Sequence, residues 1–161
     1  MRTGALSPAE SSAMSLKDQI SDDVKQAMRA GDKPRLKTLR MITAAIKQRE
    51  VDEREIVDDA GTLAIVEKMI KQRRESAEQY RAGNRPELAD IEESEIEILK
   101  AYLPEPLSEA ELDQVIDQAI AEVGVSDVSS MGQVMNLVKA RVQGRAEMRE
   151  VSGRVRARLA S

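Results

Sequence analysis

Apolar residues recur every three or four positions along most of the chain, and no segment alternates apolar and polar residues for long enough to predict a strand. In the first helical segment the apolar positions are Leu16, Ile20, Val24 and Met28. Ser15 is suited to cap this helix, and Gly31 is suited to end it. The same periodicity predicts four helices before Pro104 and three after Pro106. We therefore expect an all-α fold.

A long antiparallel helical hairpin is predicted in the middle of the chain. The acidic segment Asp52–Gly61 is expected to be a loop, and a long helix follows it to about Ala82. The apolar stripe of that helix contains one charged residue, Arg73. Residues 83–86 interrupt the helix with glycine and proline, and a second helix with its own apolar stripe follows. Such a short break favours two antiparallel helices.

Two prolines, Pro104 and Pro106, mark a domain boundary, because neither can lie inside a helix and together they stiffen the chain. We expect an N-terminal helical domain over residues 14–103, a linker over 104–107, and a C-terminal three-helix bundle over 108–161. The bundle is predicted to begin at a capping box, in which the side chains of Ser108 and Glu111 each accept a hydrogen bond from the other residue's backbone N–H.

The first thirteen residues, Met1–Ala13, are rich in Ser, Ala, Gly and Pro, so we expect a disordered extension. Met14 is an alternative natural start, because the helical pattern begins directly after it. The extension lacks the apolar core of a secretory signal. No window reaches the roughly 18 apolar residues of a membrane helix. A cytoplasmic location without membrane contact is therefore expected.

The composition excludes several classes of chemistry. The chain has no Cys, His, Trp or Phe and only two Tyr. It therefore lacks thiolate nucleophiles, histidine bases and the usual zinc ligands, and it offers little surface for stacking bases. No phosphate-binding glycine loop and no serine-hydrolase elbow is present. We predict no catalytic residue, no metal site and no cofactor.

Charge is distributed unevenly, although the formal net charge is only −4. Residues 108–130 carry six acids and no base, whereas residues 131–161 carry seven bases and two acids. Four of those bases flank the last apolar stripes and are the candidate phosphate contacts: Lys139, Arg145, Arg149 and Arg156. Guanidinium groups suit phosphate oxygens. The alternative is that these bases are ordinary solubilising surface, or that they pair with the acidic helix 108–123.

A second basic group lies on the second helix. Lys33, Lys37, Arg40 and Lys47 share an arc of about 80° when positions are spaced at about 100° per residue. A mildly acidic protein with such a face can still bind a polyanion locally. The alternative is again a solvated helix surface.

Several separated stretches resemble the YqeY-like proteins. They are Leu39–Glu50, Lys71–Ser76, Tyr102–Ser108, Met131–Met135, Gly144–Ala146, Val151-Ser152, Val155-Arg156 and Leu159. The resemblance covers about Met14 to Leu159. This family is grouped with the tail domain of the GatB subunit of the tRNA-dependent Asn/Gln amidotransferase. It therefore implies contact with tRNA, a helical N-terminal part and a C-terminal three-helix bundle. The family usually reads Gly-Arg-Ala-Asp-Gly where this chain has Glu147 and Met148 as the last two residues.

Three functions are compatible with these features. The first is a non-catalytic helical accessory protein that binds tRNA or another structured RNA. The second, implied by the family grouping, is a carbon–nitrogen ligase with glutamine as amido donor, although no catalytic site for it is visible. The third is a helical adaptor for a protein partner in translation.

Overall fold

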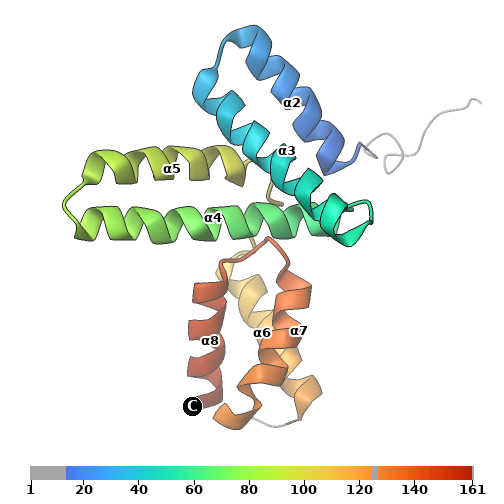
Figure 1. The fold of residues 1–161 in the computed structure, drawn as a ribbon. Helices are drawn as coiled ribbons and strands as arrows, with labels where there is room; N and C mark the ends of the chain where they lie inside the picture. The colour runs from blue at the N-terminus through green and yellow to red at the C-terminus, as the bar shows by residue number, and fades with distance from the viewer. Residues whose placement is uncertain (1–13, 125–126, 161) are drawn as a thin grey trace, which may run out of the picture. The chain divides into compact units, whose positions relative to one another are not determined.

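The computed structural model describes residues 14–124 and 127–160, and the regular structure within them is entirely helical (Figure 1). The α-helices are α2 (Leu16–Ala30), α3 (Lys33–Glu53), α4 (Asp59–Ala82), α5 (Pro86–Lys100), α6 (Glu109–Val123), α7 (Met131–Val142) and α8 (Met148–Ala160), and a short 3-10 helix, η1 (Val128–Ser130), precedes α7. The all-α prediction is confirmed. The predicted extension, Met1–Ala13, lies outside the described residues.

Both ends of α2 coincide with the capping residues identified in the sequence. The Ser15 side chain accepts a hydrogen bond from the backbone N–H of Asp18, and Gly31 ends α2 in the left-handed conformation. The loop between α3 and α4 differs from the prediction, because it spans residues 54–58 rather than the whole of 52–61. The carboxylate of Asp58 accepts from the Gly61 N–H at 2.8 Å, so α4 begins earlier than its apolar stripe indicates.

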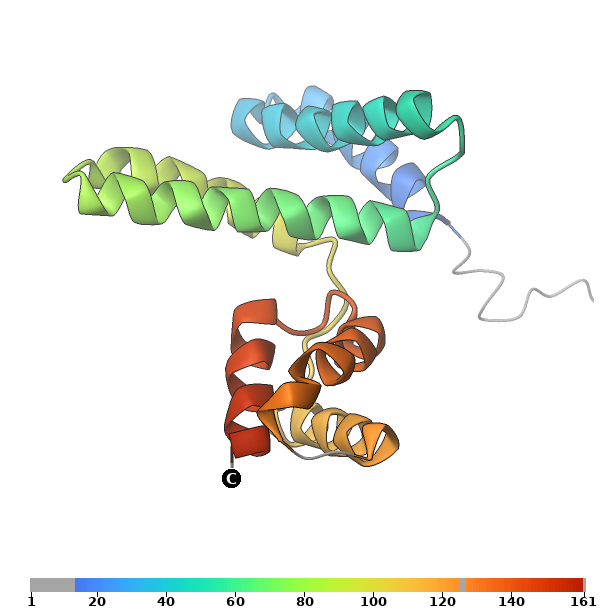
Figure 2. The same ribbon diagram turned by 60° about the horizontal axis from the view of Figure 1, so that its bottom comes forward.

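The chain divides between Tyr102 and Leu103 into two compact units, the N-terminal unit with α2–α5 and the C-terminal unit with α6–α8. In the N-terminal unit, α4 and α5 form the long antiparallel hairpin (Figures 1 and 2). Helices α2 and α3 form a second hairpin, and α3 packs against both α4 and α5. One face of α3 is therefore buried along most of its length.

The core of the N-terminal unit combines apolar residues from all four helices. Its most buried members include Ile20, Ala27, Leu39, Ile42, Val66, Ile70, Ala89 and Leu99. Because Leu39 and Ile42 are completely buried, α3 cannot rotate about its axis without exposing them. At roughly 25 cal/mol per Å² of apolar surface, such a rotation costs several kcal/mol. The outward face of α3 is thus set by the packing of its inner face.

One charged residue, Arg73, lies inside this core with 7% of its surface exposed. Its guanidinium donates to a carboxylate oxygen of Glu95 on α5 and to the carbonyl of Met69 on α4, both at 3.2 Å, and it approaches the sulfur of Met41 on α3 at 3.4 Å. Arg73 was the single charged member of the predicted stripe. The structure shows that it joins three helices because all three supply it with acceptors.

A second polar contact joins the end of α5 to α2. The hydroxyl of the buried Tyr102 donates to a carboxylate oxygen of Asp23 at 2.5 Å, and Arg35 lies 3.7 Å from the same carboxylate. Burial, together with this hydrogen bond, raises the pKa of Tyr102 above its ordinary value. Tyr102 is thus a core residue, whereas Tyr80 is only half-buried.

The C-terminal unit is a three-helix bundle around one apolar cluster. Its buried members are Leu112, Ile116, Ala119, Val134, Val138, Val142, Val151, Val155 and Leu159. The predicted capping box is present at the start of α6, where Ser108 and Glu111 satisfy each other's backbone amides. Helix α7 ends at Val142, and the backbone N–H of Gln143 caps it by donating to the carbonyl of Lys139.

The segment predicted as a linker, residues 104–107, packs against the turn between α7 and α8. Gly144 adopts a left-handed φ of 77°, and a Cβ atom there would lie 3.2 Å from Cδ of Pro104. The backbone N–H of Leu107 donates to the carbonyl of Arg145 at 2.8 Å. Glycine is required at position 144 for both its backbone angle and this close approach. The proline segment is thus part of the C-terminal unit.

We predict that Arg73→Met destabilises the protein by about 3–5 kcal/mol, because it leaves the Glu95 carboxylate in the core without its partner. The double variant Arg73→Met/Glu95→Leu should recover most of that loss, since the pair is then replaced by apolar groups of similar size. Urea denaturation followed by circular dichroism measures both values. A double variant no more stable than Arg73→Met would show that Glu95 is not the cause.

We predict that Tyr102→Phe costs about 1–2 kcal/mol through loss of its hydrogen bond to Asp23, whereas Tyr80→Phe, at a half-buried position, costs almost nothing. Because folding raises the pKa of Tyr102, its contribution is complete below the pKa of an unfolded tyrosine, about 10, and is lost only as the pH rises through the higher folded pKa. The difference between the two variants should therefore be constant from pH 6 to 9. A marked change within that range would contradict this assignment.

Candidate nucleic-acid interface

The basic residues predicted on the second helix lie together on the outward side of α3. Lys33, Lys37, Arg40 and Lys47 are all exposed, and we call this group the α3 basic face. The buried residues of the same helix, such as Leu39 and Ile42, lie on the opposite side of its axis. The packing of α3 therefore turns all four charges towards solvent.

The α3 basic face is not neutralised by neighbouring side chains. None of its four members forms an ion pair within residues 14–124 and 127–160. The acids at the end of the helix are engaged elsewhere, because Gln48 donates to Asp52 and Arg49 pairs with Glu53 at 2.9 Å. The face thus presents four uncompensated positive charges.

Three of the four bases predicted in the C-terminal unit are exposed. Arg149 and Arg156 are seven residues apart on α8, so they lie on one face of that helix, and Lys139 lies near the end of α7, which packs against α8. Lys139 and Arg156 form no ion pair within the described part of the chain, whereas Arg149 interacts with a neighbouring group. This set provides a second, smaller group of accessible charges.

Arg145, the fourth, has a structural role that the sequence did not reveal. Its Nε–H donates to the carbonyl of Glu105 at 2.9 Å, so the side chain is half-buried against the proline segment. Two hydrogen bonds with Ser108 are the main cause of the lowered pKa of Glu111, and the positive charge of Arg145 lowers this pKa further. No local signal could have identified these contacts, because the partner carbonyl lies 40 residues away in the chain. Charge reversal at Arg145 would disturb this turn.

The remaining arginines of the C-terminal unit pair with the acidic helix α6. Arg141 contacts Glu122 at 2.5 Å, Arg158 contacts Asp117 at 2.7 Å, and Arg154 pairs with Asp113 at 3.0 Å. The hydrogen bond from Arg141 lowers the pKa of Glu122, and the hydrogen bond to Asp117 raises the pKa of Arg158. The alternative of pairing with the acidic helix is therefore realised for Arg141, Arg154 and Arg158.

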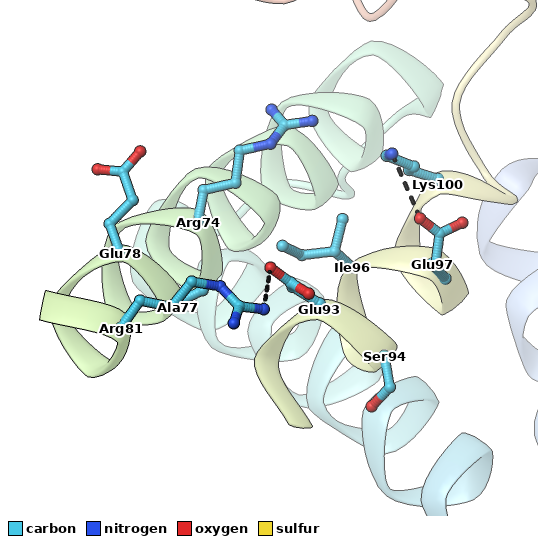
Figure 3. Close-up of a pocket in the computed structure, with 9 residues that line it drawn as sticks. All are labelled: Arg74, Ala77, Glu78, Arg81, Glu93, Ser94, Ile96, Glu97 and Lys100. Carbon is cyan, nitrogen blue, oxygen red and sulfur yellow. Dashed lines mark hydrogen bonds and ion pairs between the residues drawn. The ribbon is translucent and has the colours of Figure 1, made fainter. Parts of the chain in front are cut away.

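A groove of about 540 Å³ lies between α4 and α5 (Figure 3). Its charged groups are paired, since Arg81 contacts Glu93 at 2.8 Å and Lys100 contacts Glu97 at 3.4 Å. Arg74 and Glu78, which also line it, are engaged as well. Neutralised in this way, the groove offers weaker attraction to an anion than the α3 basic face. No cluster of metal-ligating side chains occurs among residues 14–124 and 127–160.

Comparison with known proteins identifies a matching family model and several similar proteins. A family model described as Yqey-like protein matches residues 17–159. Proteins named "Altered inheritance of mitochondria protein 41, mitochondrial" are similar over most of the chain. The one from Lachancea thermotolerans is 37% identical over 133 residues, which cover 78% of this chain and 71% of the relative. The one from Pyrenophora tritici-repentis is 30% identical over 130 residues, which cover 80% and 71%.

The cytoplasmic location expected from the sequence is contradicted by these relatives, because their names place them in mitochondria. The composition of the chain does not carry that information. No helix in the described part combines the length and the apolar character needed to cross a membrane. The family model spans nearly the whole chain, and two relatives at 30% identity or more cover over two thirds of it, so the chain belongs to the YqeY-like family.

Proposed function

We propose that this protein is a non-catalytic accessory protein that binds the phosphate backbone of a structured RNA, with tRNA as the first ligand to test. The observation that carries the proposal is the α3 basic face, four exposed bases with no acid among them and no ion pair in the described residues. A phosphate backbone is the ligand that such a face attracts most strongly, because each neutralised phosphate releases condensed counterions.

The distribution of charge in the C-terminal unit supports the same proposal. Its acidic helix neutralises the arginines at positions 141, 154 and 158, and it leaves Lys139 and Arg156 without an ion pair to any described residue. The side chains of Lys139 and Arg156 can therefore contact phosphate groups. Contacts of this kind hold the backbone in place and carry little sequence specificity.

The first test measures binding of the full chain to labelled tRNA over a range of salt concentrations. We expect the logarithm of the association constant to fall linearly with the logarithm of the salt concentration. Lys139→Gln/Arg156→Gln should reduce the slope by about two, roughly one for each lost contact. Lys68→Gln/Lys71→Gln, on α4, removes the same charge from exposed residues and should leave the slope unchanged.

Absence of salt-dependent binding in the wild-type chain would overturn the proposal. A protein partner that is recovered from cells despite nuclease treatment, and is lost at high salt, would favour the adaptor function instead. The variants are expected to remain folded, because exposed charge changes usually alter stability by no more than about 0.5 kcal/mol.

A further inference from the structure

We infer that the α3 basic face binds double-stranded segments of RNA in preference to single strands. This inference rests on the proposed function and narrows it to one class of substrate. It follows from the straight arrangement of the four bases, from the absence of aromatic side chains on the face, and from the hydrogen bond that already engages the hydroxyl of Thr43.

The α3 basic face is a straight row on a rigid support. Lys33 and Lys47 are fourteen residues apart on one helix, which corresponds to about 21 Å at 1.5 Å per residue. The opposite side of the helix is anchored by completely buried residues, including Leu39 and Ile42. The backbone positions that carry the charges are therefore fixed in a line before any ligand binds, and a rigid duplex can meet them without the ordering cost that a flexible strand incurs.

Single-stranded RNA is usually bound by aromatic side chains, on which bases stack with about 1–3 kcal/mol per base. The α3 basic face has none. The chain contains no Phe or Trp, Tyr102 is 4% exposed, and Tyr80 lies on α4. A single strand on this face would gain the backbone contacts alone, and it would also have to give up its flexibility.

The other exposed residues along the row do not read base edges. Between Lys33 and Lys47 they are Pro34, Met41, Thr43 and Ala44. The hydroxyl of Thr43 donates to the carbonyl of Leu39 at 3.2 Å, so its hydrogen is already used. Between Lys33 and Lys47 the exposed surface of α3 therefore offers positive charge and no amide or carboxylate group. Double-stranded RNA is recognised in this manner, through its shape and its phosphates rather than its sequence.

Electrostatics favours the duplex for a further reason. A duplex presents the phosphates of two strands at higher charge density, and each neutralised phosphate contributes about 0.9 to the salt slope in B-DNA, compared with about 0.7 in a single strand. None of the four bases forms an ion pair with a described residue, so all four charges are available to the phosphates of the duplex.

The test compares the full chain on two fluorescent probes by anisotropy: a blunt RNA duplex of about 16 base pairs, the span of a typical double-stranded RNA-binding domain, and one unstructured strand of the same length. We expect the duplex to bind at least about tenfold more tightly, and duplexes of unrelated sequence to bind alike. Lys37→Gln/Arg40→Gln should lower duplex affinity by about tenfold and reduce the salt slope by about two. The matched control is Lys68→Gln/Lys71→Gln, which should bind as wild type.

The outcomes separate this inference from the function on which it rests. Equal or tighter binding of the single strand, with tRNA binding retained, overturns the duplex preference alone. Duplex binding that is unchanged in Lys37→Gln/Arg40→Gln removes the α3 basic face as its site. If the wild-type chain binds neither tRNA nor the duplex, the proposed function is overturned as well. Circular dichroism confirms in each case that the variants keep their helices.

Discussion

A buried guanidinium is the constraint on which the N-terminal unit depends. Arg73 lies in an apolar core, where an unpaired charge would be too costly, so its hydrogen-bond partners must be supplied from within the core. Glu95 on α5, the Met69 carbonyl on α4 and the Met41 sulfur on α3 supply them. Because one of these contacts comes from α3, the same interaction that joins the hairpin also helps to set the rotation of the helix that carries the basic face.

The net charge of −4 does not predict which ligands this surface can bind. At physiological salt a phosphate responds mainly to charges within about 8 Å. In the C-terminal unit, surface pairs such as Arg158–Asp117 contribute little stability each, typically below about 1 kcal/mol. Their main effect is to neutralise most of the arginines beside α6. On α3 no acid lies between Lys33 and Lys47, and the acids nearer its end are engaged with Lys17, Gln48 and Arg49, so the positive charge of the α3 basic face remains available to a ligand.

Much of the fold could be predicted from the sequence, because its signals are local. Helical periodicity and end-capping residues such as Ser15 and the Ser108–Glu111 box depend on neighbours a few positions away. The α3 basic face was predictable for the same reason, since its members share one helix. The engagement of Arg145 was not, because its partner carbonyl is distant in the chain, and neither was the acceptor set of Arg73. Contacts between distant segments need the tertiary structure.

Crosslinking of the full chain to tRNA with ultraviolet light, followed by mass spectrometry of the nucleotide-modified peptides, tests most directly whether α3 meets RNA. Cleavage after acidic residues is the suitable digestion, because no acid occurs between Lys33 and Arg49, and the whole basic face stays in one peptide. We expect this peptide to carry the modification, and we expect high salt to abolish it. Modified peptides confined to α6, with the α3 peptide recovered unmodified, would contradict an RNA interface on α3.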